Sequence, residues 1–571
     1  MIGVISKVEQ SEFLEEFFEL FKTPWEAYVP GRKYDVVIST TDEVPHEESK
    51  LVISFGAATK TRDSAIGLTA TPQRKAGPFK YKGTAVPVYG ELALIESRGA
   101  STVLVSGAQG AVGIRLSMAN GTAMLRLGYD VFEEARHLLT AGQPLEHAAV
   151  PTLDLHIEML RNWIVGEGIP LLEIPAIPAD HGFIVCLTHD IDFVGIRNHK
   201  FDHTMWGFLY RSSVGAVWNF LRGRLAFRKL IQTFQAAASL PFVYFGWVKD
   251  FWSPFEWYLE VEKGLTASYF LIPFKGTAGE YVPGKYASRR AAGYDARELS
   301  EWAATLRMRG NEIGVHGIDA WHSADKGRAE LKRIEEVAGE TSHGVRMHWL
   351  LQNEKTHSVL EEAGYSYDAS AGYNESVGYR NGTTQVFRPL GARRLLELPT
   401  HIQDGALFYP NRLDLSEAEA EARCNEIIDN NKSLGGILTL IWHDRSHGPE
   451  RFWGDFYINL VETLKFSGAF FASAAGAVEW FRKRRGVRFE RAGREGASRA
   501  SLRYEGEEIR PPLRIRLYSA PRGSEKGECS KEAPLDFVDV NWNGRPLNEA
   551  DSQTVSQFLQ PTHNLTVAPQ L

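Results

Sequence analysis

The stretch FIVCLTHDID, residues 183–192, decides the fold. Its first five residues are apolar and predict a buried strand, and Asp190 and Asp192 follow at the end of that strand. Because alternate residues of a strand point to the same side, the two carboxylates can share one site, where one binds a cation and the other acts as a base. A pair of aspartates that caps a following helix gives the same pattern. The segment alone therefore leaves both interpretations open.

Similar apolar stretches recur downstream, separated by amphipathic segments. We expect further strands at 266–273, 311–317, 343–349, 365–370, 395–399, 436–443 and 469–473, and helices at 296–310, 416–431 and 474–485. Strands that alternate with amphipathic helices are typical of a β/α architecture. We therefore predict an α/β fold: a distorted (β/α) barrel with seven or eight strands, an N-terminal mixed α/β domain and a small C-terminal β appendage.

A chain of 571 residues is long enough for several domains. Shifts in the sequence pattern predict their bounds, listed here in chain order. They are an N-terminal mixed α/β domain at 1–150, a helical linker at 151–180, the barrel at 181–486 with an insertion at 196–255, the β appendage at 487–547 and a polar tail at 548–571.

Composition excludes several classes of function. The formal net charge of −7 gives no electrostatic reason to expect a nucleic-acid partner. Three widely spaced cysteines, Cys186, Cys424 and Cys529, provide neither a disulfide framework nor a thiolate zinc site. The sequence lacks a secretory pattern at its start and a long apolar stretch, so we expect a cytoplasmic protein without a transmembrane segment. The pattern does not indicate an oligomeric state.

The insertion at 196–255 is aromatic and basic. Three interpretations remain open from the sequence. Its helices can cover the barrel or a domain interface, they can form a lid over the active site, or they can contact a membrane surface.

Polar side chains stand at or just after the ends of the expected barrel strands. They are Asp190, Asp192, His316, Arg346, His348, Asp368 and His443, and His322 follows His316 by six residues. The C-terminal ends of barrel strands converge on one rim, where active sites are built. Two histidines and a carboxylate on such a rim suit Zn²⁺ or a similar divalent ion. The residues alone leave open which of Asp190, Asp192, His316, His322 and His348 would bind the ion.

Five sequence blocks carry a resemblance to a known family. THDID, EIGVHG, GVRMH, YDAS and LIWH occur in this order between residues 180 and 485. In this order they resemble the metal-dependent polysaccharide deacetylases, carbohydrate esterase family four, whose fold is a distorted β/α barrel. The resemblance implies that Asp190 is the catalytic base, Asp192 and His316 are metal ligands, Arg346 keeps the base ionised, Asp368 orients the catalytic histidine, and His443 is that histidine.

The chain departs from the family pattern in three places. Ile191 separates two aspartates that are usually adjacent, so the roles of base and ligand can be exchanged. The second block usually has two histidines four residues apart, whereas here the third ligand would be either His322, six residues after His316, or His348. The usual proline after the arginine of the third block is replaced by Met347.

The resemblance implies a hydrolase that removes an acetyl group from an N-acetylated or O-acetylated sugar. The expected substrate is an acetylated carbohydrate of polysaccharide or cell-envelope glycan biosynthesis, with a divalent metal ion, most simply Zn²⁺, as cofactor. His443 suits the role of general acid, because its ordinary pKa lies near neutrality. Two alternatives remain: a hydrolase of a small cyclic amide or ureide on the same barrel, and an inactive barrel that binds glycans or partner proteins.

Overall fold

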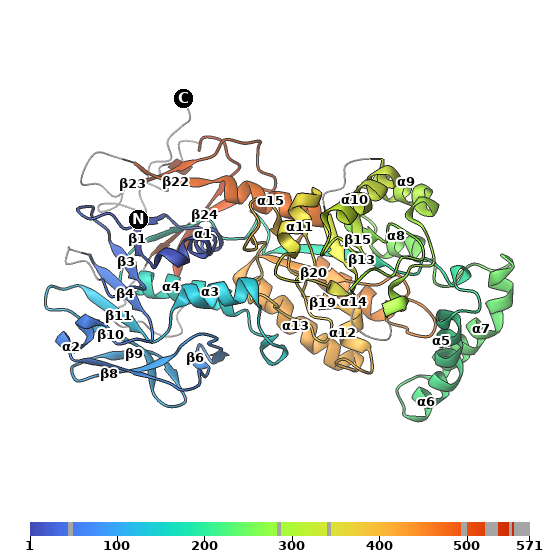
Figure 1. Cartoon of the computed structure of the whole chain (residues 1–571), viewed down its shortest axis with the longest axis horizontal. Coiled ribbons are helices and arrows are strands. Elements are labelled where there is room, and N and C mark those ends of the chain that lie inside the picture. The colour runs from blue at the N-terminus through green and yellow to red at the C-terminus, as the bar shows by residue number, and fades with distance from the viewer. Residues whose placement is uncertain are drawn as a thin grey trace. The chain divides into compact units, whose positions relative to one another are not determined.

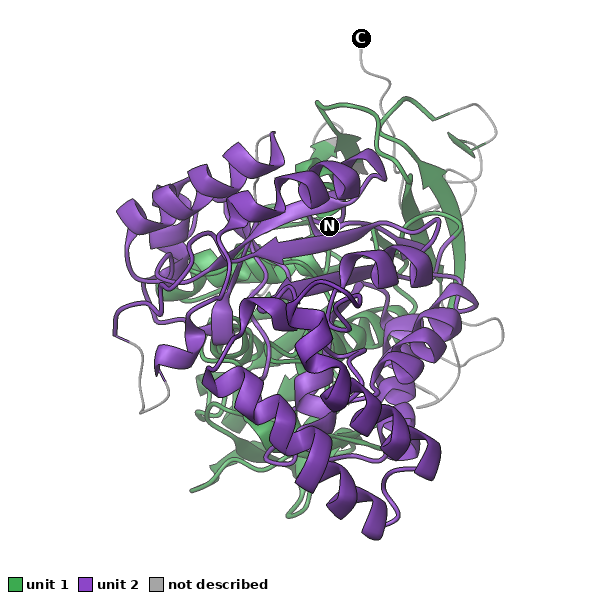
Figure 2. Ribbon diagram, turned by 90° about the vertical axis from the view of Figure 1, so that its right-hand side faces the viewer, with its two compact units in different colours: residues 1–180, 379–390, 479–571 green, residues 181–378, 391–478 purple. Residues whose placement is uncertain are grey.

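The computed structural model describes residues 1–43, 49–281, 287–339, 344–492, 499–519, 535–547 and 551–552. Contacts between residues divide the chain into two compact units (Figure 2). Unit 1 comprises Met1–Asp180, Tyr379–Leu390 and Glu479–Leu571, and unit 2 comprises His181–Gly378 and Gly391–Val478. The polar tail predicted at 548–571 lies outside the described residues, apart from 551 and 552.

Unit 1 contains the predicted mixed α/β domain, built on a nine-stranded sheet. In spatial order the strands are β2 (Trp25–Ala27), β1 (Ile2–Ile5), β3 (Val36–Ser39), β4 (Leu51–Phe55), β11 (Ala123–Leu127), β10 (Ala111–Ser117), β9 (Thr102–Gly107), β6 (Phe79–Tyr81) and β7 (Thr84–Val86). Neighbours from β2 to β11 are parallel, and those from β11 to β7 are antiparallel. Beside this sheet, α2 (Thr61–Ala65) precedes β5 (Leu68–Pro72), which pairs antiparallel with β8 (Ala93–Ser97) in a separate two-stranded sheet.

Three amphipathic helices supply the other half of the core of unit 1. They are α1 (Ser11–Leu20), α3 (Val131–Thr140) and α4 (Thr152–Gly166), and their apolar faces bury residues such as Phe17, Phe132 and Ile157 against the strands. The range 151–180, predicted as a helical linker, contains α4 and also a strand, β12 (Leu171–Glu173).

The C-terminal part of unit 1 is made of β-strands, as predicted. β24 (Leu513–Ser519) pairs antiparallel with β25 (Asp536–Trp542) on one side and with β12 on the other. A separate hairpin joins β22 (Arg488–Ala492) and β23 (Arg499–Arg503). The appendage therefore extends a strand that lies more than 300 residues earlier in the sequence.

Unit 2 contains the predicted barrel. Eight parallel strands lie in the spatial order β18 (Leu396–Glu397), β17 (Tyr367–Asp368), β16 (Gly344–Met347), β15 (Glu312–Gly317), β14 (Ala267–Leu271), β13 (Ile184–Ile191), β20 (Ile437–Ile441) and β19 (Ile402–Gln403). This is the order of a β/α barrel that stays open between β18 and β19. A short strand, β21 (Phe470–Phe471), pairs with the start of β13. The distorted barrel of seven or eight strands is thus confirmed.

Helices follow most of these strands in the chain, as a β/α fold requires. They are α9 (Ser300–Met308), α10 (Ala324–Ala338), α11 (Thr356–Ala363), α12 (Asp404–Phe408), α13 (Glu417–Leu434), α14 (Gly454–Lys465) and α15 (Ala474–Gly486). The sequence analysis placed every strand of this sheet except β19, which has only two residues. That omission matters, because β19 leads directly into Asp404 of the site.

The insertion after β13 is helical. It contains α5 (His203–Tyr210), a π-helical turn η4 (Arg211–Gly215), α6 (Ala216–Leu221) and α7 (Phe227–Tyr244), and α8 (Phe255–Val261) leads back to β14. A small apolar cluster that includes Met205, Phe208, Leu240, Val243 and Trp252 holds these helices together. In Figure 1, α5, α6 and α7 extend beyond the strands of unit 2. Among the described residues, no helix has the length and apolar character needed to cross a membrane.

Candidate metal centre and acid–base site

The end of β13 places Asp190 beside a buried arginine. All eight residues of the strand are buried, and Asp190 Oδ1 accepts a hydrogen bond of 2.9 Å from Arg346 Nη1. The same guanidinium donates to Thr188 Oγ1 and to the carbonyl of Ala369, so its plane is fixed. Burial by itself raises the pKa of Asp190, but Arg346, together with His316 and His443, outweighs burial and lowers that pKa. Asp190 is therefore a carboxylate at neutral pH.

His316 lies on β15, which is separated from β13 by one strand, β14. In the parallel register His316 lies opposite Arg346 of β16, and His316 Nδ1 donates a hydrogen bond of 2.9 Å to the carbonyl of Arg346. A backbone carbonyl can only accept, so the proton of a neutral His316 resides on Nδ1. The lone pair of Nε2 then faces the pocket, which is the tautomer that a metal ligand needs.

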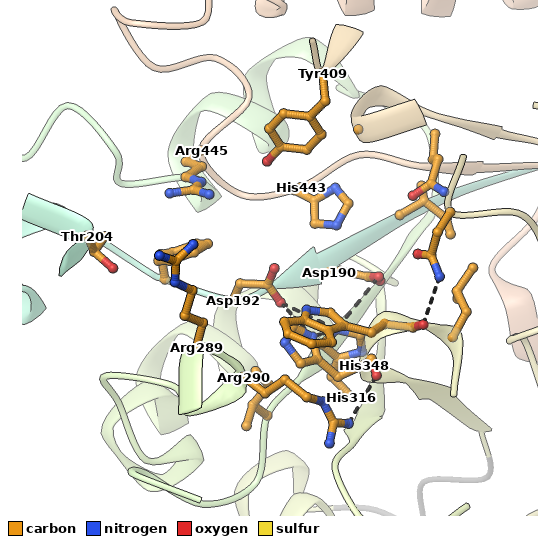
Figure 3. A pocket seen from close by; sticks show the side chains of 18 of the residues that line it. Asp190, Asp192, Thr204, Arg289, Arg290, His316, His348, Tyr409, His443 and Arg445 are labelled. Carbon is orange, nitrogen blue, oxygen red and sulfur yellow. Dashed lines mark hydrogen bonds and ion pairs between the residues drawn. The ribbon is translucent and has the colours of Figure 1, made fainter. Parts of the chain in front are cut away.

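Three ligand atoms converge next to that lone pair. His348 Nδ1 lies 2.9 Å from His316 Nε2, and Asp192 Oδ1 lies 3.4 Å from each of these two nitrogens. Asp192 Oδ1 is buried and makes no hydrogen bond with the described residues. Figure 3 shows Asp192 directed toward the two imidazoles. We call Asp192, His316 and His348 the ligand cluster.

The spacing of the ligand cluster fits a divalent cation. Bonds of about 2.0–2.1 Å separate neighbouring ligand atoms by about 3.3–3.4 Å around a tetrahedral ion, or by about 2.9 Å at a right angle. Both separations occur in the cluster. Two imidazole nitrogens and one carboxylate oxygen are donors that Zn²⁺ accepts readily, and three protein ligands leave positions open for water and substrate.

The structure brings His348, and not His322, to the ligand cluster. His322 Nε2 instead lies 3.1 Å from Asp319 Oδ1, in the loop before α10. His348 begins a turn in which Trp349 and Leu350 both have positive φ angles, 68° and 53°. Two successive non-glycine residues in the left-handed region are uncommon, and their backbone folds back so that the His348 ring meets His316. Arg290 supports this turn by donating to the carbonyl of His348 at 3.0 Å.

His443 stands two residues after the end of β20, held by Asp404. Its Nδ1 lies 2.6 Å from Asp404 Oδ1, and its backbone N–H donates to Asp404 Oδ2 at 2.9 Å. Burial alone lowers the pKa of His443, but the Asp404 carboxylate and its hydrogen bond raise it to about 10. His443 is therefore an imidazolium at neutral pH, with Nε2–H free of this contact.

The carboxylate beside His443 corrects the sequence expectation. Asp368 was expected to orient His443, but it lies at the end of β17, 2.5 Å from Ser370 Oγ, in a group with His357 and Glu397. Burial and the nearby Glu397 raise the pKa of Asp368 to about 8. Ser370 Oγ in turn accepts from the backbone N–H of Met347, so Asp368 supports the strand that carries Arg346. The orienting residue is Asp404, which the sequence analysis missed because no recognisable strand precedes it.

These side chains line one cavity of about 410 Å³. Its wall includes Asp190, Asp192, His316, His348 and His443, together with aromatic and basic residues: Trp349, Tyr409, Arg211, Arg289, Arg290, Arg412 and Arg445. Figure 3 shows His443 across Asp190 and Asp192 from the two ligand histidines. A cavity of this size accommodates a small organic substrate.

Comparison with protein-family models and with curated proteins found no match. The solved structures to which the chain is similar include a probable polysaccharide deacetylase from Pseudomonas aeruginosa PAO1, at 13% identity and a TM-score of 0.34, over 54% of this chain and 94% of that one. The allantoinase PuuE is 12% identical with a TM-score of 0.34, over 54% of this chain and 93% of that one. A family 4 acetyl xylan esterase from Clostridium thermocellum, in complex with a cobalt ion, is 13% identical with a TM-score of 0.23, over 52% of this chain and 90% of that one. These neighbours include the family that the sequence blocks resemble.

Replacing Asp404 tests the origin of the charge on His443. In Asp404→Asn the attraction that raises the His443 pKa is lost while burial remains, so we expect the pKa to fall from about 10 by two units or so, toward its ordinary value near 6.5. Nuclear magnetic resonance titration of ¹⁵N-labelled histidine in chelator-treated protein measures this directly. Asp319→Asn, which removes the carboxylate beside His322, serves as the control and leaves the His443 titration in place. An unchanged titration in Asp404→Asn contradicts the assignment.

Proposed function

We propose that this protein is a metal-dependent hydrolase that removes an acetyl group from an N-acetylated or O-acetylated sugar, in polysaccharide or cell-envelope glycan biosynthesis. One observation carries the proposal. The ligand cluster, an arginine-held carboxylate and a protonated histidine line the same cavity, with the histidine across the carboxylates from the cluster. Hydrolysis of an unactivated amide needs these three functions together: an electrophile, a base and an acid.

The ligand cluster would hold the metal. Its donor set suits Zn²⁺, and a bound divalent ion polarises a carbonyl and increases the acidity of a water molecule. Asp192 is the carboxylate of this set, because its Oδ1 faces both histidines. Asp190 is not, because its Oδ1 is committed to Arg346 and its Oδ2 lies 3.8 Å from His316 Nε2. This geometry supports the division of roles between the two aspartates that the resemblance implied.

Asp190 serves as the base. Arg346 keeps it ionised, and its second oxygen remains available to take a proton from an attacking water. A general base needs a position within hydrogen-bonding reach of its proton and a carboxylate that is charged before the reaction. Asp190 meets the second condition because the Arg346 guanidinium, which also donates to Thr188 Oγ1, donates a hydrogen bond to its carboxylate.

His443 serves as the acid on the opposite side. Asp404 binds Nδ1, so Nε2–H is left to protonate the nitrogen or oxygen that leaves as the acetyl group is transferred to water. The carboxylate also stabilises the imidazolium before the proton is given up. The pair thus resembles the orienting carboxylate and histidine found in many hydrolases, in which the carboxylate fixes the tautomer.

A carbohydrate substrate is supported by the sequence blocks and by the lining of the cavity. Trp349 is 38% exposed and forms part of the wall next to His348, and Tyr409 forms part of the wall near His443. Flat aromatic surfaces with a few convergent polar groups are typical of pockets for small ligands.

Acetate release is the experiment that tests this function. Protein supplied with Zn²⁺ or Co²⁺ is expected to release acetate from N-acetylglucosamine oligomers or acetylated xylan, and chelation is expected to abolish the release. Asp190→Asn and His443→Gln should each lower kcat by about 10²–10⁴, the usual contribution of a general base or acid.

The control variant is His322→Gln, because His322 lies outside the ligand cluster. Its rate is expected to stay within about twofold of the wild type. Turnover of allantoin without acetate release from any acetylated sugar would identify a ureide hydrolase and overturn the proposal. Equal losses in His322→Gln and Asp190→Asn would do the same for the assigned roles.

A further inference from the structure

The wall of the cavity opposite the ligand cluster contains arginines that outnumber their carboxylate partners. Arg211, Arg445 and Arg451 surround Glu450, whose Oε1 lies 3.7 Å from Arg211 Nη2 and 3.9 Å from Arg451 Nε. The side chain of Arg445 makes no hydrogen bond or ion pair with the described residues, and its guanidinium lies over the ring of Phe193 at 3.8 Å. Even with Asp444, whose charge also acts on Arg445, two carboxylates face three cations.

Two other carboxylates lie nearby. Asp404 holds His443, and Asp444 accepts hydrogen bonds at Oδ2 from the backbone N–H groups of Phe193 and Val194, while its buried Oδ1 has no hydrogen-bond partner among the described residues. Nε and Nη2 of Arg211 are buried without a hydrogen-bond partner among the described residues. Burial and repulsion by Arg445 and Arg451 together lower the pKa of Arg211 to about 10. Partly buried cations that repel each other are costly unless an anion binds between them.

We propose that Arg211 and Arg445 form an anion subsite, which binds a phosphoryl group attached to the sugar substrate. Both residues line the same cavity as Asp190 and the ligand cluster, so one molecule can occupy both places. Guanidinium groups bind phosphate through paired N–H donors. The Arg445 guanidinium stacks on the Phe193 ring, and this contact does not use its N–H donors. This subsite deepens the proposed deacetylase function and rests on it for the identity of the sugar.

Binding without turnover tests the subsite separately from the reaction. Isothermal calorimetry on chelator-treated protein compares N-acetylglucosamine 1-phosphate, N-acetylglucosamine and an N-acetylated uronic acid, which carries a carboxylate instead. We expect the phosphate to bind about tenfold or more tightly than the neutral sugar, and Arg445→Gln to remove about tenfold of its affinity. Arg445→Lys, which keeps the charge but not the paired donors, should be intermediate.

The control is Arg328→Gln, an exposed arginine on α10 outside the cavity, which leaves phosphate binding unchanged. Equal affinity for phosphorylated and neutral sugars, or unchanged affinity in Arg445→Gln, overturns the subsite. So does preference for the uronic acid over the phosphate. If the protein releases acetate from neutral sugars and the phosphate does not change binding, the proposed function stands and the subsite fails. If the phosphate binds through Arg445 but no acetate is released, the subsite stands and the proposed function fails.

A second, independent observation concerns the outer surface of the insertion. Of the twenty-five large apolar side chains that are exposed in the described part of the chain, fifteen lie between residues 201 and 248. They include Phe201 at 83%, Leu221 at 72%, Phe245 at 72% and Trp247 at 73% exposure. We call these fifteen side chains the insertion face. Soluble monomers rarely expose so many apolar groups in one segment.

Helix α7 shows why the insertion face is not explained by the fold. Its inner side buries Leu230, Thr233, Ala236, Leu240 and Val243, and the last three of these pack in the small apolar cluster of the insertion. Its outer side carries a second apolar stripe at helical spacing, which consists of Phe227, Ile231, Phe234, Phe242 and Phe245. A helix that is apolar on both sides requires a second apolar environment. The first interpretation of the sequence is that these helices cover the barrel or a domain interface, and covering the barrel does not account for this outer stripe.

The charges on the same segment indicate what that environment is. Residues 196–255 contain eight lysines and arginines but only two aspartates and no glutamate, in a chain whose net charge is −7. Arg222 stacks on the exposed Trp218 at 4.4 Å, and the Trp247 ring lies next to the rings of Phe242 and Phe245. A second copy docked face to face would oppose these cations with the same cations. Aromatic side chains interspersed with basic ones are typical of surfaces that bind anionic lipid headgroups.

We propose that the insertion face docks on a bilayer that contains anionic lipids. Because α5–α7 extend beyond the strands of unit 2, this contact needs no rearrangement of the barrel (Figure 1). Burial of the aromatic groups at the boundary of the acyl chains gives affinity, and the basic residues give preference for negative lipids.

Vesicle co-sedimentation tests the docking surface. The wild type is expected to bind vesicles of phosphatidylcholine mixed with phosphatidylglycerol about tenfold or more strongly than phosphatidylcholine alone, and added salt should weaken this binding. The triple variant Phe242→Ser, Phe245→Ser and Trp247→Ser should lose about tenfold or more of the binding. Phe466→Ser, which removes an 88% exposed phenylalanine outside the insertion, is the matched control and should bind as the wild type does.

Circular dichroism confirms that the variants are folded before binding is compared. Absence of vesicle binding by the wild type overturns the proposal, as does equal loss in Phe466→Ser and the triple variant. A dimer in light scattering that dissociates in the triple variant, without vesicle binding, would assign the insertion face to a second copy of the chain instead.

Discussion

One hydrogen bond joins the two halves of the site, from His316 Nδ1 to the carbonyl of Arg346. The parallel register of β15 and β16 sets these residues opposite each other, so the bond is a consequence of the sheet. It fixes the tautomer that turns His316 Nε2 toward Asp192 and His348, and the same Arg346 extends its guanidinium to Asp190. A shift of register by one residue would point His316 and Arg346 to the other face of the sheet, away from both aspartates.

The strand ends were predictable from the sequence because apolar runs that end in a carboxylate or histidine are conspicuous in a parallel sheet. This placed Asp190, Asp192, His316, Arg346 and His443 on one rim. Two features depended on geometry that no pattern reveals. The choice of His348 follows from positive φ angles at Trp349 and Leu350, which side-chain type does not indicate. Asp404 follows a strand of two residues, too short to recognise, and the resemblance assigned its role to Asp368 instead.

The insertion connects the two further proposals. Helix α5 places Thr204 in the wall of the cavity while Trp206 and Tyr210 are 58% and 63% exposed on the insertion face, and Arg211 of the anion subsite follows directly in η4. A short segment thus faces the reaction on one side and the surroundings on the other. A sugar that carries a phosphoryl group and a lipid would satisfy both surfaces at once, which is a physical reason for an insertion at this point of the barrel.

The central claim is that Asp192, His316 and His348 form a metal site beside an arginine-held base. Elemental analysis of purified protein after incubation with Zn²⁺ and gel filtration tests it most directly. The account predicts about one ion per chain in the wild type and in His322→Ala, and loss of that ion in His316→Ala and His348→Ala. A wild type that retains no Zn²⁺, Co²⁺, Ni²⁺ or Fe²⁺, or a His348→Ala variant that retains the ion while His322→Ala loses it, would contradict the account.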